Sequence, residues 1–255
     1  MSSVAVHHSF DGPEDAPVLV LGGSLGTSGG MWDDQVEAFG EHFRVLRYDT
    51  RGHGGSPAPP GPYAMADLGL DLLALLDRLE LERVSFCGLS IGGMVGMWAS
   101  SEAPERFDRL VLCCTVPHFP ARDLWDERAA TVRAEGMEPM VDPAIERWLT
   151  AEVRAARPEA EERLRAMLRA TAAEGYAGCC EAIRDMDLRD RLGAIEAPTL
   201  VIAGSDDPST PAERVREIAG AVAGARYVEL PRTAHIANMG RPEDFSRAVL
   251  EHLVP

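Results

Sequence analysis

A serine placed between two glycines is the first feature of the chain that could do chemistry. The segment RVSFCGLSIGGMVGMW, residues 83–98, passes from an apolar run into a helix-like pattern, with Ser90 between Gly88 and Gly92. A serine on a very tight strand-to-helix turn needs small residues two positions before and after it, as in the Gly-x-Ser-x-Gly nucleophile elbow. Chance supplies such a pentapeptide in roughly one chain in ten of this length and composition, so the motif needs supporting context.

That context is an acid and a base that follow later strand-like runs. The stretch GSDDPSTP places Asp206 and Asp207 after the apolar run 198–204, and RTAHIANMGRPEDF places His235 after the run 225–231. A nucleophilic serine needs a base that takes its proton and an acid that orients this base. The order serine, acid, histidine is the chain order of the α/β-hydrolases. We therefore interpret Ser90 as a nucleophile and His235 as its base.

A glycine-rich stretch, LGGSLGTSGG at 21–30, could bind either a phosphate or an oxyanion. It has no Gly-x-Gly-x-x-Gly register and no lysine after its glycines, so both phosphate-loop fingerprints fail. We expect the backbone N–H groups of Leu25 and Ile91 to stabilise a tetrahedral oxyanion, with an ordinary turn as the alternative. The stretch DTRGHGGS, which contains His53, precedes the serine, and we interpret it as a tight turn whose charges fix the loop.

The elements that must position these groups alternate between strands and helices. Apolar runs bounded by Gly, Pro or Asp predict buried strands, and helical patterns lie between most of them; the runs are 17–23, 43–49, 84–88, 109–115, 198–204 and 225–231. This alternation predicts an α/β fold with a mostly parallel central sheet flanked by helices.

One long stretch interrupts the alternation. Residues 118–190 contain helical patterns without a credible strand. We expect an inserted all-helical cap there, over the carboxyl edge of a core formed by 1–117 and 191–255, because ligands of such sheets bind at that edge. A helical side layer without a role in substrate binding is the alternative.

Composition narrows the class of protein further. The chain has 255 residues, enough for a sizeable core, and a formal net charge of −16, which argues against nucleic-acid and anionic-membrane partners. No apolar run has the length of a membrane-spanning helix, and the N-terminus lacks the pattern of a signal peptide. The five cysteines show no Cys-x-x-Cys spacing. We expect a cytoplasmic enzyme without a metal or cofactor, and a homo-oligomer stays open.

Three segments are specific to one family: LGGSLGTSGGMWDDQ, GLSIGGMVG and the cap stretch GMEPMVDPAIERW. Together with the motifs above, they resemble the 3-oxoadipate enol-lactonases, a branch of the α/β-hydrolases in the β-ketoadipate pathway of aromatic-compound catabolism. One departure is Gly23, where relatives often carry asparagine. The resemblance implies an α/β-hydrolase fold and water-dependent opening of an enol lactone that carries a carboxylate. It also implies that the acid is the third residue after the strand-ending Gly204, which is Asp207; Pro208 restricts its backbone.

A carboxylate-bearing substrate needs a counter-charge in this acidic protein. Arginines of the cap are the natural source, because the guanidinium binds carboxylates in a bidentate, oriented manner. We expect Arg133 to take this role, with Trp125 and Trp148 as apolar walls; the alternative is a solvated arginine and core tryptophans. Two other functions stay open: another esterase, C–C bond hydrolase or perhydrolase with the same triad, and a non-catalytic ligand sensor, which would be expected to have lost triad members.

Overall fold

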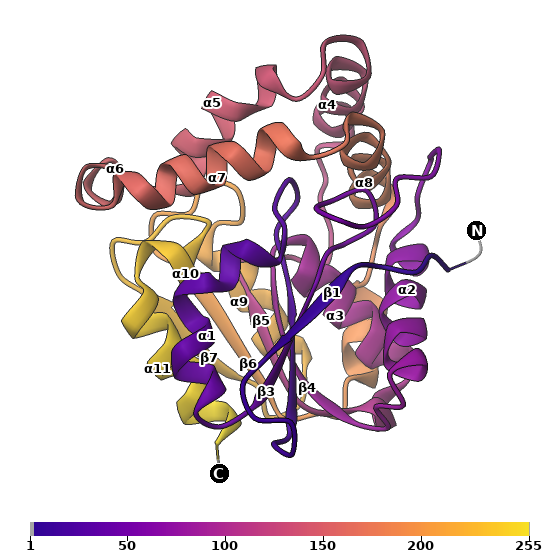
Figure 1. Ribbon diagram of the computed structural model, residues 1–255, viewed down its shortest axis with the longest axis vertical. Helices are drawn as coiled ribbons and strands as arrows, with labels where there is room; N and C mark the ends of the chain where they lie inside the picture. Colours follow the sequence, from indigo (N-terminus) through magenta and orange to yellow (C-terminus); the bar gives the residue numbers. More distant parts are fainter. Residues whose placement is uncertain (1–2, 255) are drawn as a thin grey trace.

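A seven-stranded sheet forms the centre of the molecule in the computed structural model, which describes residues 3–254 (Figure 1). The strand order is β1-β3-β2-β4-β5-β6-β7; β1 is antiparallel to β3, and every other neighbouring pair is parallel. The strands are β1 (His8–Asp11), β2 (Val18–Gly22), β3 (Arg44–Tyr48), β4 (Val84–Leu89), β5 (Phe107–Cys113), β6 (Thr199–Gly204) and β7 (Arg226–Leu230). The predicted apolar runs thus become β2 to β7.

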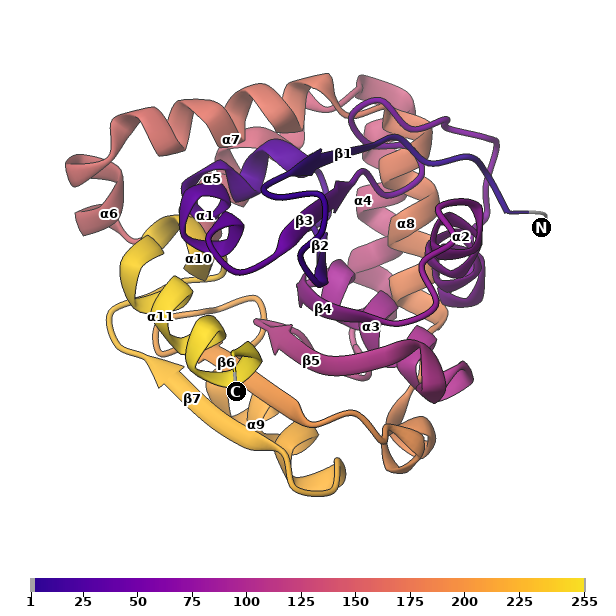
Figure 2. The ribbon, with the colours of Figure 1, turned by 60° about the horizontal axis from the view of Figure 1, so that its bottom comes forward.

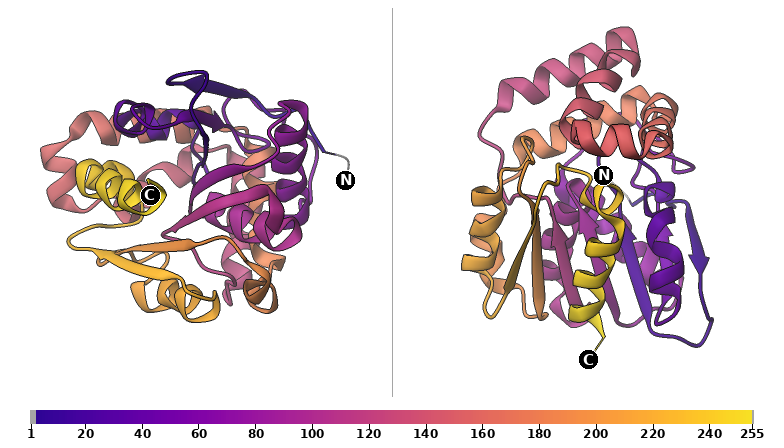
Figure 3. Two further views of the ribbon diagram at one scale, coloured as in Figure 1. Left: turned by 90° about the horizontal axis from the view of Figure 1, so that it is seen from below. Right: turned by 90° about the vertical axis from the view of Figure 1, so that its left-hand side faces the viewer.

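Helices cover both faces of this sheet (Figures 2 and 3). The helices α1 (Asp33–Gly40) and α11 (Pro242–Leu253) lie on one face, and α2 (Met65–Arg78), α3 (Ile91–Glu102) and α9 (Ala212–Ala221) lie on the other. Parallel strands buried on both sides must be apolar along their whole length. This explains why every residue of β4 and of β6 is buried. The short elements are η1 (Gly29–Trp32), η2 (Pro104–Arg106), η3 (Arg189–Ala194) and α10 (Ala237–Gly240).

Five consecutive helices separate β5 from β6 and lie above the sheet in Figure 1. They are α4 (Arg122–Glu135), α5 (Glu138–Trp148), α6 (Ala151–Ala156), α7 (Pro158–Ala170) and α8 (Ala173–Asp185). All five fall inside the stretch 118–190, and we keep these bounds as the proposed cap.

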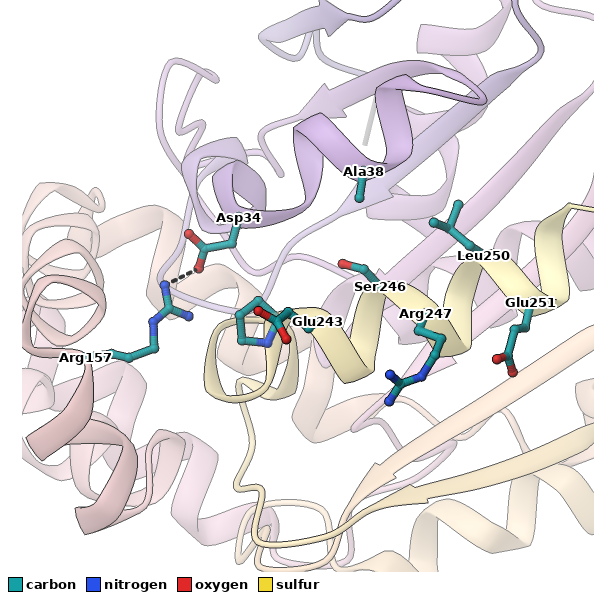
Figure 4. Close-up of a pocket in the computed structure, with 9 residues that line it drawn as sticks. Asp34, Ala38, Arg157, Glu243, Ser246, Arg247, Leu250 and Glu251 are labelled. Carbon is teal, nitrogen blue, oxygen red and sulfur yellow. Dashed lines mark hydrogen bonds and ion pairs between the residues drawn. The ribbon is translucent and has the colours of Figure 1, made fainter.

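Ion pairs join this cap to the core helix α1. Asp34 Oδ2 accepts hydrogen bonds from Arg157 Nη2 at 3.0 Å and Arg163 Nη2 at 2.9 Å, and Arg157 Nη1 also donates to the carbonyl of Met239. Figure 4 shows the Asp34–Arg157 pair at one end of a groove between α1 and α11. Charged side chains such as Glu243 make up much of the groove's lining. These contacts fix the α6–α7 end of the cap against the core.

The strand ends on the cap side also pack closely against the cap. Gly52, with a φ of +78°, lies against Gly175 of α8, and a Cβ atom on Gly52 would be 2.2 Å from the Gly175 Cα. Only glycine on both sides permits this approach, because the positive φ and the missing Cβ are both required.

No helix among residues 3–254 is long and apolar enough to cross a bilayer.

Candidate active site

Ser90 occupies the sharp turn between β4 and α3. Its φ of +58° and ψ of −119° are strained for a residue with a side chain. The flanking glycines allow this turn: a Cβ on Gly88 would be 2.4 Å from the Gly92 carbonyl oxygen, and one on Gly92 would be 2.3 Å from the oxygen of Gly22. The backbone N–H of Ser90 donates to the carbonyl of Cys113 at 2.9 Å, which holds the turn against the next strand. The glycines at two-residue spacing are therefore required by close backbone packing.

The structure brings Ser90, His235 and Asp207 together in a buried chain of hydrogen bonds. The distance from His235 Nε2 to Ser90 Oγ is 2.9 Å, and that from His235 Nδ1 to Asp207 Oδ2 is 2.8 Å. All three residues are buried, and they follow β4, β7 and β6 respectively. Since a carboxylate can only accept, Nδ1 carries the proton and Nε2 is free to accept the serine hydroxyl proton. This is the geometry of a serine nucleophile with its base and orienting acid.

Asp207 is held by four hydrogen bonds. Besides His235, the hydroxyl of Thr210 donates to Oδ2 at 2.5 Å, and the backbone N–H groups of Ser209 and Thr210 donate to Oδ1 at 2.8 and 3.1 Å. Burial acts to raise the pKa of Asp207, but the charge and hydrogen bond of His235 and the bonds from Thr210 outweigh it and lower this pKa below its usual value. Asp206 instead accepts from the Ser205 hydroxyl at the surface. Thr210 had no signal in the sequence beyond its place three residues after Asp207.

Two backbone N–H groups near Ser90 are free to bind an oxyanion. Among residues 3–254, the N–H groups of Leu25 and Ile91 have no hydrogen-bond partner. Ile91 is the first residue of α3, and Leu25 lies with Ser90 on the wall of one pocket. The N–H of Gly92 donates to the Gly23 carbonyl at 3.0 Å, which ties the elbow to the loop after β2. Both predicted donors are thus without an internal partner in the described part of the chain, as donors to an oxyanion in acyl transfer must be.

A small pocket leads to Ser90 between the core and the cap. The core contributes Ser24, Leu25, Ser90, Met94, Ser209 and His235 to its wall, and the segment between β5 and β6 contributes Phe119, Trp125, Arg128, Ala144, Arg147, Trp148, Tyr176 and Ile183. The structure therefore places both predicted tryptophans beside the candidate nucleophile. The indole N–H of Trp125 and the hydroxyl of Ser24 are buried without a partner among the described residues. The wall of this small pocket combines apolar side chains with a few polar groups, the composition usual for small-molecule sites.

Two arginines, Arg128 of α4 and Arg147 of α5, supply positive charge to this pocket. Neither takes part in an ion pair or a side-chain hydrogen bond with any residue between 3 and 254. The Arg128 guanidinium lies 4.8 Å from the centre of the Trp125 ring. Burial, followed by the neighbouring charge of Arg128, lowers the pKa of Arg147 from its ordinary value. Two unpaired cations side by side in a partly buried pocket favour an anionic ligand.

Arg133 does not line this pocket. Its guanidinium makes four hydrogen bonds to the carboxylates of Glu174 and Glu181 on α8, at 2.6 to 3.1 Å. These bonds use the positive charge of Arg133 to join α4 to α8 at the surface. The structure thus assigns the pocket-facing positions to Arg128 and Arg147, which sequence reasoning missed. The spacing of three residues between Trp125 and Arg128 could have indicated Arg128, because such residues share one face of a helix.

Comparisons with known proteins agree with this geometry. Residues 16–242 match the family model described as alpha/beta hydrolase fold. The chain is 38% identical to 3-oxoadipate enol-lactonase 2 of Acinetobacter baylyi over 96% of its own length and 92% of that protein. It is similar to the crystal structure of the enol-lactonase from Burkholderia xenovorans LB400, with a TM-score of 0.95, 42% identity, and 98% and 96% of the two chains covered. It is also 32% identical to the protein named "Putative carbamate hydrolase RutD" of Rhizobium rhizogenes, over 96% of this chain and 95% of that one.

Proposed function

The chain belongs to the α/β-hydrolase fold family and is a hydrolase, and from this premise we propose that it opens the ring of 3-oxoadipate enol-lactone to give 3-oxoadipate. The observation that carries the choice of substrate is the pair of unpaired arginines in the same pocket as Ser90. A neutral ester has no group for Arg128 and Arg147 to bind. A lactone with a carboxylate arm presents its carbonyl to the serine and its carboxylate to the guanidinium groups. The enol-lactonase relatives support the same choice.

The proposed reaction begins with acylation of the serine. Ser90 Oγ attacks the lactone carbonyl carbon while His235 Nε2 takes the hydroxyl proton, as the 2.9 Å contact permits. The carbonyl oxygen becomes an oxyanion that accepts hydrogen bonds from the N–H groups of Leu25 and Ile91. The ring C–O bond then breaks, and the imidazolium proton of His235 passes to the departing enol oxygen. An enolate is a good leaving group, so this step needs less assistance than the loss of an alkoxide.

Hydrolysis of the acyl-enzyme uses the same groups in reverse. His235 takes a proton from water, the hydroxide attacks the acyl carbon, and the ester bond to Ser90 breaks with return of the proton to Oγ. The enol end of the product tautomerises to the ketone. The net reaction adds one water and releases one molecule, since the leaving group and the acyl group belong to the same ring. No step in this scheme requires a group beyond the residues described above.

The role of the arginines can be tested with matched variants of the cap. Arg147→Ala and Arg128→Ala are each expected to lower kcat/KM for the anionic lactone by about ten- to hundredfold, since a charged hydrogen bond contributes about 1.5–3 kcal/mol. The same variants should change kcat/KM for neutral nitrophenyl acetate by less than about threefold, because that ester makes no charged bond to them. Arg133→Ala is the control: it removes a cap arginine that is paired at the surface, and it should not distinguish the two substrates.

Steady-state kinetics on both substrates shows whether Arg128 and Arg147 recognise the carboxylate. An equal loss of kcat/KM on both would mean that the arginines support folding and do not recognise a carboxylate. If Arg133→Ala alone lost kcat/KM for the lactone, with Arg128→Ala and Arg147→Ala unaffected, Arg133 would be the residue that binds the carboxylate, as the sequence analysis predicted.

A further inference from the structure

His53 lies outside the triad, yet it makes a buried hydrogen bond to the loop that carries Leu25. The side chain is 1% exposed. The backbone N–H of Gly26 donates to His53 Nε2 at 2.8 Å, and His53 Nδ1 lies 3.1 Å from the carbonyl oxygen of Arg51. A carbonyl oxygen can only accept and an amide N–H can only donate, so Nδ1 carries the proton and Nε2 does not. Burial lowers the pKa of His53 from its ordinary value, which keeps Nε2 unprotonated at neutral pH.

The bonded N–H belongs to the peptide unit that follows Leu25 directly. Gly26 adopts a φ of +82°, and the loop around it is rich in glycine, so the backbone there has little conformational preference of its own. A second bond from the same neighbouring segment reinforces the loop: Asp49 Oδ1 accepts from the N–H of Gly29 at 2.7 Å. The turn 49–56 therefore fixes the loop 24–30 at two backbone N–H groups.

We propose that His53 is a positioning residue for catalysis, whose Nε2 fixes the Leu25–Gly26 peptide so that the Leu25 N–H points at the developing oxyanion. This inference rests on the proposed acyl transfer at Ser90. Donors in an oxyanion hole accelerate a reaction most when they are oriented before the charge develops. Reorienting them during the reaction costs free energy, which offsets their stabilisation of the transition state. A loop held at Gly26 meets this condition. Without the His53 acceptor, the Gly26 N–H would be left buried without a partner, and the loop that carries Leu25 would lose this anchor.

The test compares His53→Gln with His53→Asn. The amide oxygen of glutamine reaches about as far from the backbone as Nε2 and can accept from the Gly26 N–H. The asparagine amide corresponds to the Nδ1 position, so it can still donate to the Arg51 carbonyl but is too short to reach Gly26. Both variants keep a polar, hydrogen-bonding side chain at a buried site. His252→Asn is the control for replacing a buried histidine. His252 lies on α11, away from the pocket, and its ring bonds to the carbonyl of Pro198 just before β6.

Two measurements distinguish positioning from folding. The first is kcat and KM with nitrophenyl acetate. The second is the inhibition constant of a trifluoromethyl ketone, which forms a tetrahedral adduct with the serine and places an oxyanion in the hole. His53→Asn is expected to lower kcat by about ten- to hundredfold, somewhat less than the loss of a whole oxyanion donor. The inhibition constant should rise by a similar factor, with KM within about threefold of wild type.

His53→Gln should recover kcat and the inhibition constant to within about fivefold of wild type, and His252→Asn should leave both unchanged. The proposal is overturned if His53→Asn keeps wild-type kcat and ketone affinity, or if Gln and Asn are impaired equally. Ser90→Ala is assayed alongside: full activity in that variant would refute the proposed function itself. An inactive Ser90→Ala with a fully active His53→Asn would refute only the role of His53.

Discussion

Replacing Asp207 by asparagine is a sharp perturbation of this site, because the hydrogen bonds of the carboxylate dictate which way the amide must turn. Oδ1 accepts from two backbone N–H groups, those of Ser209 and Thr210, and these donors cannot reverse their role. Oδ2 accepts from His235 and from the Thr210 hydroxyl, which can rotate and accept instead. The amide oxygen of asparagine will therefore take the Oδ1 position, and the amide NH₂ will face His235 Nδ1.

This orientation of the amide changes the tautomer of His235. Since the NH₂ group donates, Nδ1 must accept and lose its proton, and the neutral imidazole then carries its proton on Nε2. An Nε2–H cannot take the proton of Ser90. The variant also lacks the negative charge that stabilises the imidazolium during the reaction. The loss in kcat is expected to reach about four orders of magnitude, the effect of the same replacement in the Ser-His-Asp template.

Asp206→Asn is the matched control, because it makes the same chemical change one residue earlier in the chain. Among residues 3–254, its carboxylate accepts only from Ser205 at the surface, so kcat should stay within about twofold of wild type. Steady-state hydrolysis of nitrophenyl acetate at neutral pH measures both variants, and circular dichroism confirms that each is folded. The reasoning is refuted if Asp207→Asn loses less than about tenfold in kcat, or if Asp206→Asn is the more damaged variant.

Two further predictions concern stability. The pKa of Asp207 is held below its ordinary 3.8, so the ionised carboxylate stabilises the fold above about pH 4 and this contribution is lost as the pH falls through the lowered pKa. The difference in free energy of unfolding between wild type and Asp207→Asn, from urea titrations, should thus shrink below about pH 4; a constant difference would contradict this. Gly52→Ala should lower the free energy of unfolding by about 1–3 kcal/mol in thermal or urea unfolding, because the new methyl group meets Gly175 at 2.2 Å. In the control, Gly220→Ala on α9, the added Cβ has nothing within 4 Å and should be neutral or stabilising; equal destabilisation by both would show that the contact between Gly52 and Gly175 is not tight.

Much of the core could be predicted from the sequence, because its signals are local. Each buried parallel strand is a short apolar run, and the residue that follows its carboxyl end can be counted directly. The choice of Asp207 over Asp206 rests on the family resemblance, which implies an acid three residues after the strand-ending Gly204, and the structure has Asp207 beside His235. Gly88 and Gly92 likewise indicate positions where the backbone packs too closely for a side chain.

The cap could not be predicted to the same depth, because the rotation of each helix about its axis is set by tertiary packing. Arg128 and Arg133 lie five residues apart on α4, which at 100° per residue places them about 140° apart around the helix. Only one of them can face the pocket. The cap helices carry many arginines, so the sequence alone does not indicate which arginine this is. The carboxylates of Glu174 and Glu181 on α8, distant in sequence, decide the orientation of Arg133. The role of His53 could not be predicted from the sequence either, because its hydrogen-bond partner is the backbone N–H of Gly26 in a separate loop.

The central claim, that Ser90 opens a carboxylate-bearing enol lactone, is tested most directly by following ring opening itself. Purified wild type and Ser90→Ala are mixed with 3-oxoadipate enol-lactone, and loss of the lactone's ultraviolet absorbance is recorded against the uncatalysed rate. Wild type is expected to reach a kcat/KM of about 10⁴ M⁻¹s⁻¹ or more, as enzymes do on their own substrates. Ser90→Ala should lose at least about a thousandfold. A wild-type protein that hydrolyses nitrophenyl acetate but leaves the lactone at its uncatalysed rate would contradict the proposed substrate, and a Ser90→Ala protein that opens the lactone as fast as wild type would contradict the mechanism.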